Sequence, residues 1–224
     1  LDRKELIMTK ALTEQAVEFP LVSLFEISIT GLCNRRCPFC PRHDPDIYPN
    51  VNEMMAPALH TKMMRELGGL QYSGLIVYSG YSEPLAHRGL DQAVAEARHH
   101  CPGAKIEVYT NGDFLTASLA RRLIDAGLST ILVSLYDGSH QIEHFTTIRR
   151  EAALSAAQFI LRERYKLDQG EGLHLSNRAG MIDFKRMNTQ PLRGPMKRRC
   201  HLPFYMMMID HTGDVYLCSH DWVK

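Results

Sequence analysis

The sequence LFEISITGLCNRRCPFC, residues 24–40, determines how the rest of this chain is interpreted. Its first part, 24–30, is rich in aromatic and β-branched residues, which predicts a β-strand. The strand leads directly into a loop that begins at Gly31 and carries three closely spaced cysteines. We therefore expect a cysteine loop at the carboxyl end of the first strand.

The order of strand followed by helix recurs along the chain. Further strands are predicted for the apolar runs at 74–79, 105–110 and 130–135, and for a segment near 173–176. Helices are expected between them, over 57–67, 86–100, 116–126 and 141–166. Strands that alternate with amphipathic helices favour a parallel sheet with right-handed crossovers. We predict an α/β fold, a partial (β/α)6 TIM-like barrel, with a doubly wound sheet as the alternative; both place functional loops at the carboxyl ends of the strands.

The sequence changes character after residue 190. The segment PLRGPMKRRC, 191–200, is basic and interrupted by Pro and Gly, and apolar runs then flank the turn at His211, Thr212 and Gly213. This arrangement predicts a small C-terminal β-hairpin. We divide the chain into an N-terminal extension (1–23), a core (24–194) and the start of a small second module (195–224).

Composition excludes several classes of partner. The chain has 224 residues, 45% of them hydrophobic, and balances 26 Lys and Arg against 25 Asp and Glu. A net charge of +1 creates no field that attracts nucleic acid or an anionic membrane. No apolar run is as long as a membrane span, and the start LDRKELIMTK is too polar for a secretory signal. We expect one main cytoplasmic domain that binds neither nucleic acid nor membranes.

The six cysteines are grouped rather than spread along the chain. They are Cys33, Cys37 and Cys40 in one loop, Cys200 and Cys218 near the end, and Cys101 alone. Close grouping is typical of metal sites, because disulfide frameworks distribute their cysteines among separate loops. Thiolates suit iron–sulfur clusters and zinc, and a loop with three of them leaves one metal position open. The alternative for this loop is a zinc site with a distant His or Cys as its fourth ligand.

The segment CNRRCPFC, 33–40, resembles the CX3CX2C signature of the radical S-adenosylmethionine (SAM) superfamily. The resemblance implies a barrel of the radical SAM type in which Cys33, Cys37 and Cys40 hold a [4Fe–4S] cluster. Its open iron would bind SAM, whose reductive cleavage to a 5′-deoxyadenosyl radical removes a hydrogen atom from the substrate. It also implies a flavodoxin or ferredoxin as the reductant. Arg35 and Arg36 could receive such an acidic protein, or they could form a solvated basic loop.

Later strand ends carry matching segments. Ser79 to Pro84 resembles the GGEP segment of the superfamily, with Ser82 where glycine is usual, and this makes Glu83 the expected acceptor for the SAM amino group. Together the resemblances assign cofactor binding to Phe39, Ser79, Tyr81, Glu83, Asn111 and Ser134. The alternatives are a helix-capping role for Glu83, a simple Asn-Gly turn at Asn111 and core packing for Phe39.

The last part of the chain resembles superfamily members with SPASM or twitch modules. Arg178, in LHLSNRAGMI (173–182), would bind or polarise the substrate as a catalytic residue, or it faces solvent. The interval from Gly213 to Cys218 matches the GX4C pattern of these modules, so Cys200 and Cys218 are expected to bind a second iron–sulfur cluster whose other ligands we do not identify. The alternatives are two ordinary buried cysteines, or a zinc site completed by His201, His211 or His220. Cys101 is expected to be structural.

The resemblance implies a radical SAM oxidoreductase, dehydrogenase-like, that oxidises a small polyol, sugar or aminocyclitol. One alternative is a radical SAM maturase that modifies a ribosomal peptide. The other is a zinc or iron–sulfur protein without enzymatic activity.

Overall fold

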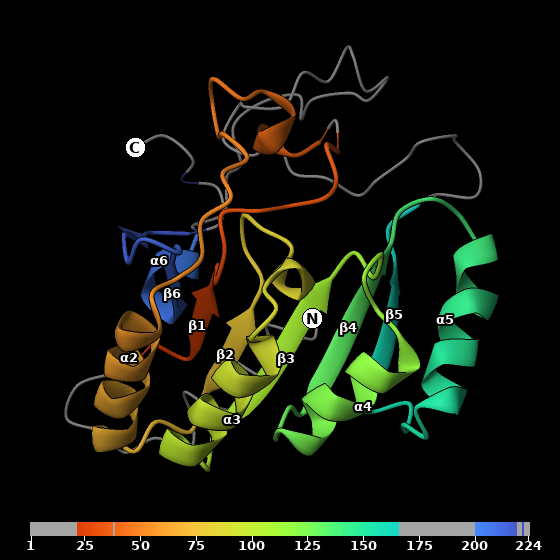
Figure 1. The fold of residues 1–224 in the computed structure, drawn as a ribbon. Coiled ribbons are helices and arrows are strands. Elements are labelled where there is room, and N and C mark those ends of the chain that lie inside the picture. The colour runs from red at the N-terminus through yellow and green to blue at the C-terminus, as the bar shows by residue number, and fades with distance from the viewer. Residues whose placement is uncertain (1–21, 38, 166–199, 219–220, 222–224) are drawn as a thin grey trace.

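The computed structural model describes residues 22–37, 39–165, 200–218 and 221. Figure 1 shows how its elements follow one another. The strands are β1 (Leu24–Ile27), β2 (Leu75–Tyr78), β3 (Lys105–Thr110), β4 (Thr130–Leu135), β5 (Phe159–Glu163), β6 (Met206–Ile209) and β7 (Val215–Tyr216). The helices are α2 (Pro57–Gly69), α3 (Leu90–His100), α4 (Ala117–Asp125), α5 (His140–Glu151) and α6 (Leu202–Tyr205), with 3-10 turns η1 (Pro41–His43) and η2 (Pro84–Ala86). None of these helices is long and apolar enough to cross a membrane.

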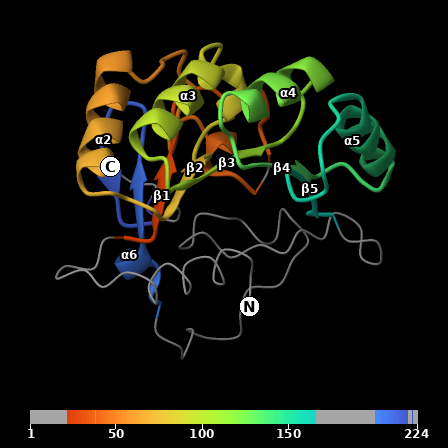
Figure 2. The ribbon, with the colours of Figure 1, turned by 90° about the horizontal axis from the view of Figure 1, so that it is seen from below.

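The described strands form one sheet in the order β5-β4-β3-β2-β1-β6-β7. Neighbours among β1 to β5 are parallel, β6 is parallel to β1, and β7 is antiparallel to β6. Helices α2 to α5 lie along one face of the sheet, as Figure 2 shows from below. These findings confirm the α/β class, the parallel sheet and the C-terminal hairpin predicted from the sequence. The strand expected near 173–176 lies outside the described residues.

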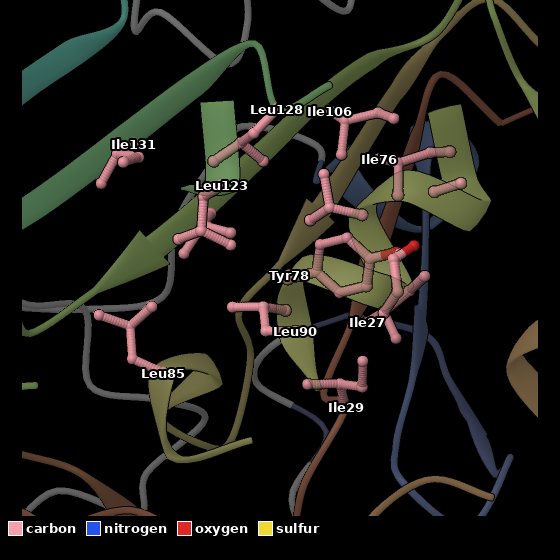
Figure 3. Packing of buried hydrophobic residues seen from close by; sticks show 14 of the residues in the cluster. Ile27, Ile29, Ile76, Tyr78, Leu85, Leu90, Ile106, Leu123, Leu128 and Ile131 are labelled. Atoms are coloured by element: carbon pink, nitrogen blue, oxygen red, sulfur yellow. The ribbon is translucent and has the colours of Figure 1, made fainter. Parts of the chain in front are cut away.

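The main core lies between the sheet and the helices. Alternate residues of the central strands point towards the helices, so Ile76, Tyr78 and Ile106 pack with Leu90 and Leu123 (Figure 3). All five of these side chains are at most 2% exposed. Burying an aliphatic side chain of this size stabilises a fold by about 1.5–3 kcal/mol relative to leaving it in water.

The opposite face of the sheet carries a smaller apolar cluster. Leu24 of β1, Leu75 and Val77 of β2 and Met206 of β6 form this cluster and are at most 4% exposed. Buried residues on both faces of β1 and β2 are typical of a parallel sheet that is covered on both sides. The first strand of the hairpin is therefore part of the main sheet, directly beside β1. The module boundary near 195 stays a prediction, because residues 166–199 lie outside the described residues.

The single helix predicted over 141–166 is wrong, because α5 ends at Glu151. Ala153 adopts the left-handed conformation, with φ of 52°, and this interrupts the helical path. The main-chain N of Phe159 then donates to the O of Ser155 at 3.1 Å, and the residues FILRE pair with β4 as strand β5. Pairing within the sheet thus overrides the helical propensity of this alanine-rich segment.

Candidate functional site

The candidate site is formed by loops at the carboxyl ends of the first four strands. The loop after β1 carries the three cysteines and lies above these strand ends in Figure 1. Parallel strands bring their carboxyl ends to one edge of a sheet, so this loop can reach its neighbours. Hydrogen bonds and ion pairs connect it to the loops after β2, β3 and β4.

The cysteines of this loop interact with one another. Cys33, Cys37 and Cys40 form no disulfide bond and are partly buried. Burial raises the pKa of Cys33, and it raises the pKa of Cys37 to about 12, with repulsion from the other two thiolates adding to the effect. A cation shared by the three sulfurs would remove this repulsion, as a metal centre does.

This donor set fits an iron–sulfur cluster, since it consists of three soft ligands on one loop. Within the described part of the chain, no three His, Cys, Asp or Glu side chains are already gathered closely enough to hold a metal ion. Contacts that hold the loop over the strand ends are part of the site.

Arg35 fixes the cysteine loop to two other strand ends. Its guanidinium makes a bidentate contact with Asp113 after β3, at N···O distances of 2.5 and 2.6 Å. A second bidentate contact joins it to Asp137 after β4, at 2.8 and 2.9 Å. Such pairs fix geometry as well as charge, and hydrogen bonding to Asp113 raises the pKa of Arg35. Arg35 is thus occupied within the chain, whereas Arg36 is exposed.

Glu83 connects three strand ends and is 2% exposed. Its Oε1 accepts from the hydroxyl of Thr110 at 2.5 Å and from the N of Leu85 at 3.0 Å, and its Oε2 accepts from the N of Asn111 at 2.8 Å. Its main-chain N donates to the O of Leu32 in the cysteine loop at 2.8 Å. Burial raises the pKa of Glu83 to about 7, although the three hydrogen bonds act to lower it. The bond to Leu85 also caps η2, so the capping role considered for Glu83 is present as well.

The loop after β3 makes a second connection to the cysteine loop. Nδ2 of Asn111 donates to Oδ1 of Asn34 at 2.9 Å, and Oδ1 of Asn111 accepts from the N of Asp113 at 2.9 Å. The turn needs Gly112, which has φ of +83°, and a Cβ there would lie 2.5 Å from the ring of Phe145. Asn111 therefore stabilises its own turn and the cysteine loop. Its contact with a cofactor stays a prediction.

Three further predicted cofactor residues lie at the same edge of the sheet. The ring of Phe39 is 8% exposed and lies 5.3 Å from the ring of Tyr136, in the loop after β4. Ser134 is buried near the end of β4, and Ser79 follows β2, where its O accepts from the hydroxyl of Ser28 at 3.1 Å. Their positions suit contact with a ligand above the strand ends, and cofactor binding by them stays a prediction.

Tyr81 is directed towards the C-terminal hairpin. Its ring lies 5.0 Å from that of Tyr48 and 5.4 Å from that of Tyr216 on β7. Its hydroxyl donates to the main-chain O of Asp221 at 2.7 Å and lies 3.2 Å from the O of Cys218. The side chain thus joins the hairpin to the loop after β2, and its predicted contact with a cofactor is not tested by this geometry.

The C-terminal residues are only partly described. Cys200 is exposed, and Cys218 packs against the apolar cluster around Leu24 and Met206. Nε2 of His211 lies 3.2 Å from Oε2 of Glu53. Neither a second cluster nor a zinc site is assembled among the described residues. Both His220 and the predicted catalytic residue Arg178 lie outside them.

Cys101 is structural, as expected. It is 1% exposed at the end of α3, and its thiol lies 3.8 Å from the O of Met64. Burial raises its pKa, which suits an unreactive thiol in the core.

Two residues beside the cysteines, Arg42 and Asn50, were not predicted from the sequence. Oδ1 of Asn50 accepts from the N of Cys33 at 2.8 Å, and its Nδ2 donates to the O of Cys33 at 3.0 Å. The same Oδ1 accepts from Nη1 of Arg42 at 2.8 Å, and Arg42 is only 4% exposed. The one signal in the sequence is an arginine two residues after Cys40, the last cysteine of the loop. This signal does not predict burial, because arginine is normally found at the surface.

Known proteins resemble this chain over much of its length. Residues 27–166 match the family model described as the radical SAM superfamily. The S-adenosyl-L-methionine-dependent 2-deoxy-scyllo-inosamine dehydrogenase of Niallia circulans is 29% identical over 202 residues, which cover 90% of this chain and 75% of the dehydrogenase. The GTP 3',8-cyclase of Mycobacterium marinum is 32% identical over 130 residues, 58% of this chain but only 35% of the cyclase.

Solved structures show the same fold. The crystal structure of BtrN in complex with AdoMet and 2-DOIA superimposes with a TM-score of 0.70 at 25% identity, covering 91% of this chain and 75% of BtrN. BtrN in an open conformation gives a TM-score of 0.63 at 23% identity, with coverage of 91% and 72%. The second similarity supports the fold alone.

Proposed function

Because this chain belongs to the radical SAM superfamily, we propose that it is a dehydrogenase that oxidises a hydroxyl group of a small polyol, sugar or aminocyclitol. The supporting observation is the extent of its similarity to 2-deoxy-scyllo-inosamine dehydrogenase, which covers 90% of this chain and so reaches well beyond residues 27–166. The similarity to the GTP 3',8-cyclase of Mycobacterium marinum covers 58% of the chain. The relative that matches nearly the whole chain is thus the better guide to the reaction.

Cys33, Cys37 and Cys40 would hold a [4Fe–4S] cluster that, with SAM, supplies a radical able to take a hydrogen atom from the substrate. The chain contributes the surroundings of this chemistry. Phe39 packs against Tyr136 and against Cys37 and Cys40, which shields these two cysteines on one side. Arg35 holds the loop over the strand ends, which limits how far the cysteines can move.

Glu83 is suited to bind the amino group of SAM. A carboxylate offers about four acceptor positions, and three of them are filled by Leu85, Thr110 and Asn111. The remaining position can accept an N–H in a site shielded from water, where such charge-assisted bonds are strong. The hydroxyl of the preceding residue, Ser82, is buried and has no hydrogen-bond partner among the described residues, which fits contact with a polar ligand atom.

Oxidation of an alcohol to a carbonyl removes two hydrogen atoms in total. One leaves as a hydrogen atom, and the other leaves as a proton and an electron, so the reaction also needs a base and a one-electron acceptor. A second iron–sulfur cluster at Cys200 and Cys218 would supply such an acceptor. By resemblance, Arg178 would bind or polarise the hydroxyl, since a guanidinium is too weak a base to remove its proton. A flavodoxin or ferredoxin would be the source of electrons for the first cluster.

An anaerobic assay tests the proposed function. The protein is reconstituted with iron and sulfide, reduced with dithionite and given SAM and 2-deoxy-scyllo-inosamine deuterated at the carbinol carbons. We expect 5′-deoxyadenosine that carries deuterium and a keto product, and neither in the Cys37→Ala variant. Absence of SAM cleavage by a protein with a full cluster would contradict the radical reaction. SAM cleavage without deuterium transfer from any polyol, sugar or aminocyclitol tested would contradict the substrate class.

Iron counting tests the second cluster separately. Two cubanes require about eight irons per chain, and a single cubane requires about four. We expect the Cys200→Ser and Cys218→Ser variants to lose iron down to the lower value and to keep SAM cleavage. An iron content near four in the unmodified protein would contradict a second cubane.

A further inference from the structure

Arg42 is a buried cation next to the cysteine loop. It is 4% exposed, and its guanidinium lies over the ring of Tyr48, 4.9 Å from the ring centroid. Its Nη1 donates to Oδ1 of Asn50 at 2.8 Å and to the O of Pro49 at 3.3 Å, and its Nε donates to the O of Tyr81. Nη2 is buried as well and has no hydrogen-bond partner among the described residues.

None of these contacts neutralises the charge of Arg42. They are two main-chain carbonyls, an amide oxygen and an aromatic ring, and no Asp or Glu of the described part of the chain pairs with it. Burial lowers the pKa of Arg42, but a guanidinium hardly deprotonates in proteins, so the positive charge persists. A buried cation without an anion is unfavourable. Arg42 is therefore expected to face a negative group in the working protein.

Arg42 is close enough to Tyr48, Cys33 and Cys40 for their charges to interact. Ionised forms of these three groups would favour the charged form of Arg42, against the effect of burial. Asn50 connects the two sides, since its Oδ1 accepts from both Nη1 of Arg42 and the main-chain N of Cys33 at 2.8 Å. The guanidinium is thus held at a fixed place relative to the first cysteine.

We propose that Arg42 is the buried counter-charge of the cluster held by Cys33, Cys37 and Cys40, and that it raises the reduction potential of that cluster. The inference rests on the proposed function and adds a residue that sets how easily the cluster accepts its electron. A cluster that takes one electron from an external donor gains one unit of negative charge. A buried cation stabilises this reduced form more than the oxidised form, and salt screens it little.

The test compares midpoint potentials. Wild-type protein and Arg42→Gln are reconstituted with iron and sulfide, and potentiometric titration without SAM is followed by electron paramagnetic resonance. A parallel sample with SAM identifies the signal of the cluster with the open iron. We expect the equilibrium constant for one-electron reduction to fall at least tenfold in Arg42→Gln, a shift of about 59 mV to lower potential. Arg42→Lys keeps the charge and should lie closer to the wild type.

Two further variants make the result specific. Arg36→Gln removes the same charge from an exposed position of the same loop, so its potential should stay that of the wild type. Asn50→Asp keeps an oxygen for Nη1 but gives Arg42 an anionic partner, and it should also lower the potential. A potential unchanged in Asn50→Asp would overturn the proposal even if Arg42→Gln failed to take up iron. An equal shift of the reduction potential in Arg36→Gln and Arg42→Gln would also overturn the proposal.

Failure of the proposed function would look different. If the wild-type protein loads iron but makes no 5′-deoxyadenosine, the proposed enzymatic function is wrong. The reduction potentials of the variants can still be compared in that case, so the role of Arg42 is tested separately. Normal SAM cleavage in the wild type, with identical potentials in all loaded variants, would remove only the role of Arg42.

Discussion

The hydroxyl of Thr110 donates to Oε1 of Glu83 at 2.5 Å, across the ends of β3 and β2. Both residues are buried, at 4% and 2% exposure, so water does not compete for this bond. The oxygen of the same hydroxyl accepts from the N of Gly112 at 2.9 Å, which leaves its hydrogen for Glu83. Thr110 thus orients the carboxylate that we propose for SAM binding.

Thr110→Val keeps the shape of the side chain and removes its hydroxyl. A hydrogen bond to a charged group contributes roughly 1.5–3 kcal/mol, so the free energy of unfolding should fall by about that amount in urea denaturation at pH 8, where Glu83 is mostly charged. The affinity for SAM should also fall, because the carboxylate is no longer held in one orientation. Thr110→Ser keeps the donor and should retain most of both properties. A valine variant as stable as the serine variant would contradict the importance of this bond.

Glu83 should make the stability of the apoprotein depend on pH. Burial raises its pKa from the ordinary value of 4.5 to about 7. Between these values the folded chain keeps a proton that the unfolded chain has released. The stabilisation from this proton is therefore complete below pH 4.5 and is lost as the pH rises through 7.

Comparison with Glu83→Gln isolates this effect, because groups such as His60 titrate in both proteins. Urea unfolding at pH 5 and pH 8 gives the free energy of unfolding of each. We expect the difference, wild type minus variant, to decrease by about 1–3 kcal/mol between the two pH values. A difference that does not change with pH would show that the pKa of Glu83 is the same in the folded and unfolded chains.

Patterns local in sequence were enough to predict most of the fold. The runs at 74–79, 105–110 and 130–135 are apolar over short lengths with glycines or turns nearby, and they became β2, β3 and β4. Strand β5 was missed because FILRE follows an alanine-rich stretch that is equally compatible with a helix. FILRE is a strand because it pairs with β4, and this pairing cannot be read from a pattern that is local in sequence.

Some features of the site could likewise be predicted from the sequence, and others could not. The spacing of the cysteines and the position of Glu83 after a strand are local features, and both were found from the sequence. The partners of Arg35 are Asp113 and Asp137, which lie 78 and 102 residues away, and nothing in their own segments indicates that they bind an arginine. Arg42 is a charged residue that is buried, contrary to the usual preference of arginine for the surface.

Two glycines provide a matched pair of variants. Gly112→Ala places a Cβ 2.5 Å from the ring of Phe145 at a φ of +83°, so we expect a loss of about 1–3 kcal/mol in the free energy of unfolding. Gly69→Ala adds a Cβ that meets nothing within 4 Å at the end of α2, and it should stabilise the protein by about 0.5–1 kcal/mol. Thermal unfolding of the two variants and the wild type measures both effects. Equal melting temperatures for the two variants would contradict the tight turn after β3.

Arg35 should determine how long the protein keeps its cluster. Arg35→Met removes both bidentate contacts that join the cysteine loop to the loops after β3 and β4, while Asn34 keeps its bond to Asn111. Each pair is partly exposed and contributes about 1 kcal/mol or less, so together they correspond to roughly a tenfold change in rate or equilibrium. Loss of the visible absorption of the cluster in the presence of a chelator should therefore be about tenfold faster than in the wild type.

Two variants separate the geometry of Arg35 from its charge. Arg35→Lys keeps the charge but cannot make two forked contacts, so its rate of cluster loss should lie between those of the wild type and Arg35→Met. Arg36→Met removes an exposed charge from the same loop and should lose the cluster at the rate of the wild type. If Arg35→Met and Arg36→Met lost their clusters equally fast, the ion pairs to Asp113 and Asp137 would not be what holds the loop. Its other contacts, among them Asn34 with Asn111 and Phe39 with Tyr136, would then hold it.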